Sequence, residues 1–222
     1  MSFDPSRRHP LRPFDLDRFT GATLFDRIGR TLCAAECVPR KELYESWEVA
    51  RRVRRRWRGG RVVDLACGHG LIAHLMLILD DSSPSAIAAD PHLPDSAEPI
   101  ARALTAAWPR LEGRVSLTTA RIEDVALAPD DVVVSAHACG ALTDEVLARA
   151  IEANARVAVL PCCHATKKND TGGLEGWMDH ALAIDATRVA TLRAAGYDVR
   201  TQTIPAAITP KNRLLLATPR GA

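Results

Sequence analysis

The spacing of apolar residues along the chain changes near residue 60. Before this point apolar side chains recur every three or four positions, which predicts one helix over 17–36 and another over 41–57. After it, short apolar runs alternate with longer amphipathic stretches, which predicts strands that alternate with helices. This order is typical of a Rossmann-like, doubly wound α/β fold, whose mostly parallel sheet carries helices on both faces.

The predicted elements divide the chain into two parts. The first strand begins at residue 62, and further strands are expected at 85–90, 115–119, 131–136, 156–160, 199–204 and 214–218. Helices are expected between them at 71–79, 97–108, 143–153 and 182–195. No helix separates the last two strands, so we expect an antiparallel C-terminal hairpin. An arginine-rich helical segment, 1–58, therefore precedes a sheet domain, 59–222.

The composition is that of an ordinary soluble globular protein, with 222 residues, 47% of them hydrophobic, and a net charge of +2. No apolar run approaches the ~20 residues of a membrane span, and the first residues lack the apolar core of a signal peptide. Six cysteines without a secretion signal indicate free thiols or metal ligands. We expect a cytoplasmic protein with no membrane contact, and the sequence leaves its oligomeric state open.

Residues 62–70, Val-Val-Asp-Leu-Ala-Cys-Gly-His-Gly, are the most informative stretch. An apolar run that carries Asp64 breaks into a loop in which Gly68 and Gly70 flank one residue. Strand, glycine loop and helix then form a βα unit whose backbone can approach a ligand closely. A dinucleotide-binding loop would have a third glycine, and Ala73 stands there, as the looser form of that motif allows.

The stretch resembles motif I, D-x-G-x-G-x-G, of the class I S-adenosylmethionine-dependent methyltransferases, with Ala66 in place of the first glycine. The resemblance implies a class I methyltransferase sheet, S-adenosyl-L-methionine as cofactor, and Asp64 close to the amino-acid portion of that cofactor. The backbone of Ala66, Cys67, Gly68 and Gly70 would run beneath the ligand. The alternative is a tight turn in an unrelated α/β domain.

Asp90 ends the second predicted strand, 20 residues after Gly70. A carboxylate at this place binds the ribose hydroxyls of a nucleoside in folds of this type. An ordinary turn aspartate is the alternative, since Asp-Pro also signals a turn. The acid that often borders the adenine after the third strand is replaced by Arg121, so we expect Ile122 and Glu123 near the adenine.

Histidines and cysteines follow three of the predicted strands: Cys67 and His69, then His137 and Cys139, then Cys162, Cys163 and His164. The carboxyl ends of parallel strands share one edge of a sheet, and these three strands are neighbours in the class I methyltransferase order. We therefore expect these side chains to converge near the methyl group of the cofactor, with His137 also contacting the cofactor.

Two of these segments resemble a narrower group of methyltransferases. His-Ala-Cys-Gly-Ala-Leu-Thr-Asp at 137–144 and Pro-Cys-Cys-His at 161–164 are similar to the paired motifs of the group that includes the methyltransferase-like 25 proteins and the Trm13-like tRNA 2′-O-methyltransferases. Residues 40–45 and 208–216 resemble further segments of that group, and the likeness spans 38–218.

Three kinds of chemistry are open at this edge, and we expect His137, Cys139, Cys163 and His164 to take part in catalysis. First, His137 or His164 is a general base, since histidine titrates near pH ~6.5. Second, a thiolate of Cys139, Cys162 or Cys163 adds to a pyrimidine ring. Third, the cysteines and His164 hold zinc. We rank zinc last and predict no metal, because adjacent cysteines seldom both reach one tetrahedral ion. Strand alternation further predicts that one of Cys162 and Cys163 points inward.

The run 51–58 carries six arginines and Trp57. Guanidinium groups match phosphate geometry and an exposed aromatic ring can stack on a base, so Arg51, Arg54, Arg55 and Trp57 are predicted to bind substrate. Asn212, in the turn of the closing hairpin, is predicted to join them. RNA is then the first expected substrate, and a solvated helix face is the alternative for the arginines. The other readings are a small-molecule methyltransferase and a cofactor-binding or zinc-binding adaptor without turnover.

Overall fold

The computed structural model describes residues 4–136, 138–164 and 169–221. These residues form a seven-stranded sheet of order β3-β2-β1-β4-β5-β7-β6. The strands are β1 (Val62–Leu65), β2 (Ala86–Asp90), β3 (Val115–Thr119), β4 (Val132–Ser135), β5 (Arg156–Val159), β6 (Tyr197–Thr203) and β7 (Arg213–Pro219). The first five pair in parallel, whereas β7 runs antiparallel to both β5 and β6. The predicted doubly wound sheet with an antiparallel C-terminal hairpin is therefore confirmed.

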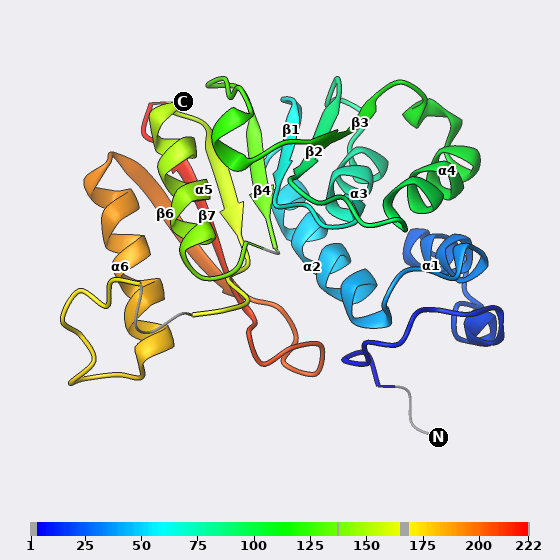
Figure 1. Cartoon of the computed structure of the whole chain (residues 1–222), viewed down its shortest axis with the longest axis horizontal. Coiled ribbons are helices and arrows are strands. Elements are labelled where there is room, and N and C mark those ends of the chain that lie inside the picture. Colours follow the sequence, from blue (N-terminus) through cyan, green and yellow to red (C-terminus); the bar gives the residue numbers. More distant parts are fainter. Residues whose placement is uncertain (1–3, 137, 165–168, 222) are drawn as a thin grey trace.

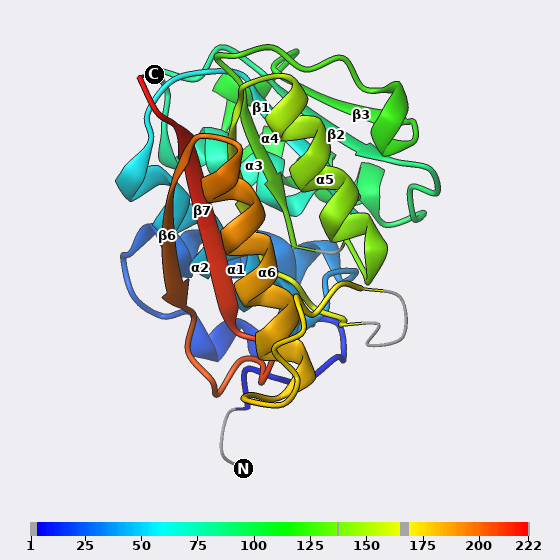
Figure 2. The same cartoon turned by 90° about the vertical axis from the view of Figure 1, so that its left-hand side faces the viewer.

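Helices cover both faces of the sheet (Figure 1). The helices are α1 (Leu24–Ala35), α2 (Arg40–Arg56), α3 (Leu71–Leu79), α4 (Ala97–Ala107), α5 (Ala141–Glu152) and α6 (His180–Ala194), with short 3₁₀ turns η1 (Pro13–Arg18), η2 (Pro109–Leu111) and η3 (Ile122–Asp124). The four helices from α1 through α4 share one hydrophobic core with one face of the sheet. The helices α5 and α6 share a second core with the other face. Figure 2 shows α5 and α6 side by side over β7 and its neighbours.

Strand residues divide between these two cores by simple alternation. Val62, Val132 and Val134 contribute to the first core, whereas Val63 and Val133 contribute to the second. All are fully buried. Strands buried on both faces read as continuous apolar runs, which is the pattern that the sequence shows.

The N-terminal segment shares the first core with the sheet domain. Leu11, Phe19 and Leu43 are completely buried within it. The ring of Phe19 lies so close to Gly29 that a Cβ there would come within 2.2 Å of it. Residues 1–58 and 59–222, which the sequence separates by composition, therefore pack against each other over the described part of the chain.

The direction of α2 decides which of its residues lie near the carboxyl ends of the strands. The helix ends just before β1 begins and runs back along the sheet, so its first turn lies at the carboxyl edge and its last turn at the amino edge (Figure 1). The segment before α1 and the connection between β6 and β7 also lie at the carboxyl edge.

Among the helices described, none has the length and apolarity that a membrane span requires.

Candidate active site

The loop between β1 and α3 has left-handed backbone at three positions, Ala66 (φ 52°), Gly68 (φ 54°) and Gly70 (φ 69°). Gly70 is also a point of close approach, because a Cβ there would lie 2.9 Å from Cδ2 of Leu117 and 3.1 Å from Cβ of Ala88. Glycine is required where both conditions hold. The loop is thus packed tightly onto β2 and β3 at the carboxyl edge.

Asp64 lies under this loop and is 1% exposed. Its Oδ2 accepts a hydrogen bond from the backbone N–H of Ala73 at 3.3 Å, while its buried Oδ1 has no partner among the described residues. Burial raises the pKa of this carboxyl well above its usual value. A buried acceptor without a donor costs free energy, so the position suits a ligand that brings a donor or a positive charge.

Asp90, at the end of β2, holds the same loop from the other side. Its Oδ2 accepts from the N–H of Gly68 at 3.1 Å and its Oδ1 from the N–H of His92 at 2.9 Å. Each oxygen keeps a further lone pair, which fits the predicted contact with ribose hydroxyls. The unpaired acceptor of Asp64, the glycine loop and the carboxylate of Asp90 together fit S-adenosylmethionine.

The residues predicted near the adenine lie in η3. Ile122 is buried in the second core, whereas Glu123 is half exposed and pairs with Arg121 at 3.0 Å. Their contact with the adenine stays a prediction.

A cavity of about 510 Å³ lies at the carboxyl edge, between the N-terminal segment, the ends of β4 and β5, and the connection between β6 and β7. It is lined by both charged residues and cysteines: Arg8, Lys41, Glu42, Glu45, Cys139, Cys162, Cys163, Thr209 and Lys211, with Pro39, Ala136 and Pro210. Glu42 joins this cavity to the glycine loop, because its Oε2 lies 3.0 Å from Nε2 of His69. The other ring nitrogen of His69, Nδ1, lies 2.6 Å from Oγ of Ser96.

The contribution of the N-terminal segment to this cavity was not predicted from the sequence. Lys41, Glu42 and Glu45 come from the first turns of α2, within the segment 40–45, whose sequence resembles a segment of the narrower group described above. That resemblance was the available signal. The pairing of Lys41 with Glu45 at 2.8 Å follows the i, i+4 spacing of a helix.

Three of the predicted cysteines meet at the wall of the cavity. The Sγ atoms of Cys139, Cys162 and Cys163 all lie within 4.8 Å of one another, and those of Cys139 and Cys162 are 3.1 Å apart. Burial raises the pKa of both the Cys139 and the Cys162 thiol. Strand alternation predicts that one of Cys162 and Cys163 points inward; Cys162 is the more buried of the two and Cys163 is exposed, but both line the cavity. The alternation stops because β5 ends at Val159.

His164 does not join the thiols at the cavity wall. Its side chain is 3% exposed, and its Nε2 lies 2.8 Å from Oδ1 of Asp185. Asp185 also accepts from Arg188 at 3.2 Å and from Arg213 at 2.6 Å. The expectation of His164 as a general base at the methyl group is therefore corrected, because its ring is enclosed in an ionic network beneath the loops. His137 lies outside the described residues.

The remaining predicted members of the cluster are also dispersed. Cys67 is 3% exposed, packs in the first core and is not part of the group of three thiols. His69 is held between Glu42 and Ser96. The expected convergence of four cysteines and three histidines thus reduces to three cysteines among the described residues.

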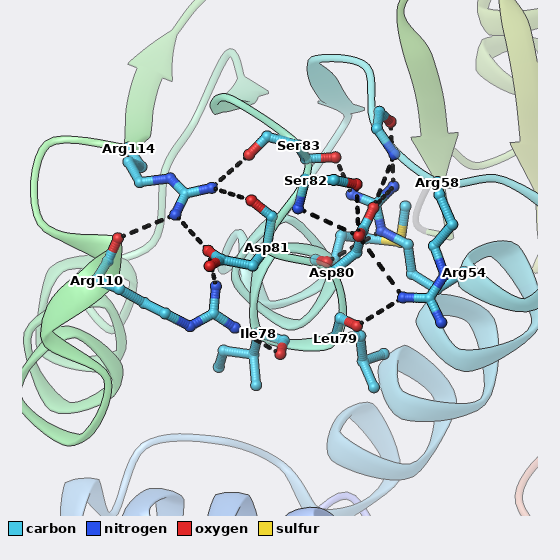
Figure 3. Close-up of polar contacts among 12 residues, drawn as sticks. Arg54, Arg58, Ile78, Leu79, Asp80, Asp81, Ser82, Ser83, Arg110 and Arg114 are labelled. Atoms are coloured by element: carbon cyan, nitrogen blue, oxygen red, sulfur yellow. Dashed lines mark hydrogen bonds and ion pairs between the residues drawn. The ribbon is translucent and has the colours of Figure 1, made fainter.

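The basic run at 51–58 lies away from the cavity, toward the amino edge. Arg54 is 2% exposed; its Nε donates to the carbonyl of Met76 at 3.0 Å, and its guanidinium pairs with Asp80 at 3.2 Å. Figure 3 shows Arg54 and Arg58 reaching Asp80 in a network of polar contacts that continues through Asp81. Burial lowers the pKa of Arg54 to about 10. The prediction that Arg54 binds substrate is wrong, because its side chain is buried and paired.

Trp57 is likewise 6% exposed, and its indole N–H donates to Oγ1 of Thr218 at 3.0 Å, so it cannot stack on a base. Arg51 pairs with Glu48 at 2.9 Å, and Arg55 is exposed. The side-chain amide of Asn212 donates to the carbonyl of Ile204 at 3.0 Å and closes the hairpin connection. Its neighbour Lys211, rather than Asn212, lines the cavity.

Solved structures of methyltransferases share this fold. The cofactor-bound protein Rv0187 from MTB aligns over all of both chains with a TM-score of 0.58 and 17% identity. An O-methyltransferase family protein from Burkholderia thailandensis aligns over 96% of this chain with a TM-score of 0.54 and 19% identity, and this chain spans 64% of its length. A protein described as a candidate rRNA methylase from Clostridium thermocellum aligns over 76% of this chain and 92% of its own, with a TM-score of 0.52 and 15% identity.

At these identities the likeness concerns the fold. The sequence matched none of the curated proteins with which it was compared. A family model described as "Methyltransferase domain" matches residues 41–170, which is more than half of the chain. The chain therefore belongs to this family and is an S-adenosylmethionine-dependent methyltransferase domain of class I fold.

Proposed function

We propose that this domain methylates a hydroxyl or amine of an RNA, of the tRNA-like class, that enters the cavity at the carboxyl edge. The observation that carries the proposal is the lining of this cavity, where the cationic side chains of Arg8, Lys41 and Lys211 share the wall with the three thiols and with the carboxylates of Glu42 and Glu45. Such groups attract a phosphodiester backbone. The likeness of 137–144 and 161–164 to the group that contains tRNA 2′-O-methyltransferases also supports it.

The residues of the chain supply binding and orientation. S-adenosylmethionine, when bound, supplies a methyl group that its sulfonium already activates. Asp64 would balance the positive charge of its amino-acid portion, and Asp90 would accept from its ribose. Since the donor is activated, most of the rate enhancement should come from holding acceptor and donor together in line.

A proton acceptor is needed because an attacking hydroxyl, or an amine that has attacked in its neutral form, must give up a proton. His137 stays the predicted base. Among the described residues, Glu42 is the second candidate, because it lines the cavity and contacts His69 of the glycine loop at 3.0 Å. A carboxylate in this place can accept the proton directly or through water.

A small-molecule acceptor is the second candidate function. The cavity of about 510 Å³ lies in the range of small-molecule sites, roughly 300–1,000 Å³. The exposed Arg55, moreover, lies on the part of α2 that leads away from the cavity. A small acceptor would be bound entirely within the cavity, so this second candidate gives no binding role to Arg55.

One experiment separates these candidates. The protein is incubated with S-adenosylmethionine labelled on its methyl group and, separately, with total RNA, total protein and small metabolites from a cell extract. Label in RNA supports the proposal, and label only in the small-molecule fraction supports the second candidate. Asp64→Ala, which should lose cofactor binding, is the control for contaminating activity. Cofactor binding without label in any fraction would favour an adaptor and contradict both.

A further inference from the structure

The three cysteines at the cavity wall form a compact group to which the proposed transfer to a hydroxyl or amine gives no part. Cys139 follows β4, while Cys162 and Cys163 follow β5. Their Sγ atoms lie within 4.8 Å of one another, and all three residues line the same cavity. Two neighbouring thiols occur easily by chance, but three that share one wall need an explanation.

The spacing of the sulfur atoms suits a tetrahedral metal ion. Zinc–sulfur bonds of about 2.3 Å place two thiolate ligands about 3.8 Å apart. The separation of 3.1 Å between Cys139 and Cys162, and the upper limit of 4.8 Å for all pairs, bracket this value. Shifts of less than about 1 Å in side chains at least partly open to the cavity would therefore complete the geometry.

The two loops that carry the cysteines are joined to each other and supported from below. The N–H of Gly140 donates to the carbonyl of Cys163 at 3.1 Å, and Gly140 has a φ of 61° that favours glycine. Arg188, which is 3% exposed, donates to the carbonyl of Gly140 at 3.2 Å and pairs with Asp144 at 2.7 Å. These contacts hold the two loops together, so that the site is partly pre-organised for a ligand although it lies outside the helices and strands.

The chemistry of the donors selects the kind of ion. Thiolates are soft ligands, which prefer zinc and similar cations to magnesium or calcium. We propose that Cys139, Cys162 and Cys163 bind one thiophilic divalent cation, of the zinc class, through three thiolates. Each thiol loses its proton to solvent as its sulfur binds the ion, so up to three protons are released per ion.

An ion bound here would keep one position free of protein ligands among the described residues. Because all three cysteines line the cavity, that fourth position would be left to a solvent molecule or to an acceptor group inside the cavity. Three protein ligands and one exchangeable position are typical of catalytic rather than structural zinc sites. Adjacent cysteines seldom both reach one tetrahedral ion, but β5 ends at Val159 and the Sγ atoms of Cys162 and Cys163 both lie within 4.8 Å of that of Cys139.

Metal binding is tested on the intact, reduced protein without any measurement of methyl transfer. The protein is freed of metal with a chelator and titrated with Zn²⁺, with Co²⁺ as a spectroscopic probe, and with Mg²⁺ as the hard-cation control. We expect one Zn²⁺ per chain, thiolate-to-cobalt absorption bands with one equivalent of Co²⁺, and no binding of Mg²⁺. Of the six free thiols, three should become protected from a thiol reagent when Zn²⁺ is bound.

Single substitutions locate the site. Cys139→Ser, Cys162→Ser and Cys163→Ser should each weaken Zn²⁺ binding at least about 100-fold. Cys37→Ser is the matched control, because this half-buried thiol lies in the N-terminal segment with its Sγ 3.9 Å from the carbonyl of Ser96. It should bind Zn²⁺ like the parent protein. Circular dichroism shows whether each variant folds, and the cobalt spectrum of the parent protein tests the site without variants.

Two results would overturn the inference. One is an absence of zinc-dependent thiol protection and of cobalt bands in the reduced parent protein. The other is undiminished Zn²⁺ affinity in all three variants, which would place any bound metal elsewhere. If mass spectrometry finds a Cys139–Cys162 disulfide and the reduced protein takes up no Zn²⁺, the closeness of these thiols reflects redox pairing, and the metal site is refuted. None of these results depends on whether the acceptor is RNA.

Discussion

The carboxylate of Asp64 is the residue on which cofactor binding should depend most. Its Oδ1 is buried without a donor among the described residues, and burial raises its pKa, so the free protein bears a cost that a cationic ligand relieves. Hydrogen bonds to charged groups contribute about 1.5–3 kcal/mol. We therefore expect Asp64→Ala to weaken S-adenosylmethionine binding at least about tenfold, as measured by calorimetry.

The control for this measurement is Asp130→Ala, which removes an exposed aspartate from the turn before β4. Its affinity for the cofactor should equal that of the parent protein. Equal affinities for Asp64→Ala and the parent protein, with both folded, would refute the role of Asp64.

Arg54 should support the fold rather than the substrate. Its buried guanidinium satisfies the carbonyl of Met76, the hydroxyl of Ser83 at 2.6 Å and the carboxylate of Asp80. Breaking a buried ion pair by removing one partner costs about 3–5 kcal/mol. Arg54→Ala should therefore lower the free energy of unfolding by several kcal/mol in urea titrations. The exposed Arg55→Ala should change it by less than about 0.5 kcal/mol, and a similar loss in both variants would contradict the assignment.

The contrast between Asp64 and Arg54 shows which residues a sequence can identify. The motif that contains Asp64 combines an apolar strand with two glycines, so strand, loop and acid occupy fixed relative places. The arginines of the run 51–58 are under no such constraint, since an arginine can extend over a core or pair inside it. The same holds for Trp57, because the sequence does not show whether its ring is exposed or buried. Whether such side chains reach solvent depends on the segments packed beside them, here α3 and β7.

At the scale of elements, the ionic network between the loop after β5, α6 and β7 should make stability depend on pH. Burial by itself would raise the pKa of Asp185, but hydrogen bonds and charge from His164 and Arg213 outweigh it and hold the pKa below its usual value. A lowered carboxyl pKa in the folded state gives stability that is present above the usual value near 3.8 and is lost as pH falls through the folded value.

We therefore expect Asp185→Asn to destabilise the protein by about 2–4 kcal/mol at pH 7, since it leaves Arg188 and Arg213 without their shared carboxylate. The difference from the parent protein should shrink as pH falls below 4, as measured by denaturant unfolding. Asp198→Asn is the matched control, because its ion pair with Arg220 at 3.1 Å is exposed and should contribute little. A difference that stays constant down to pH 3 would exclude a contribution from the ionised carboxylate.

Most of the elements were predictable, although the helix expected over 17–36 is divided into η1 and α1, whereas the contacts between loops were not predictable. Alternating apolar runs gave the order of strands and helices, and the missing helix before β7 gave the hairpin. The burial of His164 and the grouping of Cys162 and Cys163 with Cys139 depend on the path of the chain after β5 ends at Val159. Beyond the end of a strand, the alternation of side chains no longer fixes their direction. The sequence therefore predicts that such residues lie at the carboxyl edge of the sheet, but not which of them meet in one site.

At the scale of the whole molecule, charge is distributed so that the proposed RNA contacts and the conspicuous arginines lie at opposite edges of the sheet. Arg8, Lys41 and Lys211 line the cavity at the carboxyl edge, whereas Arg55 and Arg58 lie at the amino edge. Lys41 is paired with Glu45. The exposed Lys211 is therefore the better probe of an RNA contact at the cavity, and Arg55 is its natural counterpart at the other edge.

Salt dependence provides the measurement that compares these two edges. If the phosphodiester backbone enters the cavity, the RNA affinity measured by fluorescence anisotropy should fall as salt rises. The logarithm of the binding constant should fall linearly with the logarithm of the salt concentration, with a slope of about −0.7 for each phosphate contacted on a single strand. Lys211→Glu should weaken binding several-fold and reduce the slope by about that amount, while Arg55→Glu should leave both unchanged. The reverse result would move the RNA to the amino edge, away from the glycine loop, and leave the cavity to a small-molecule acceptor.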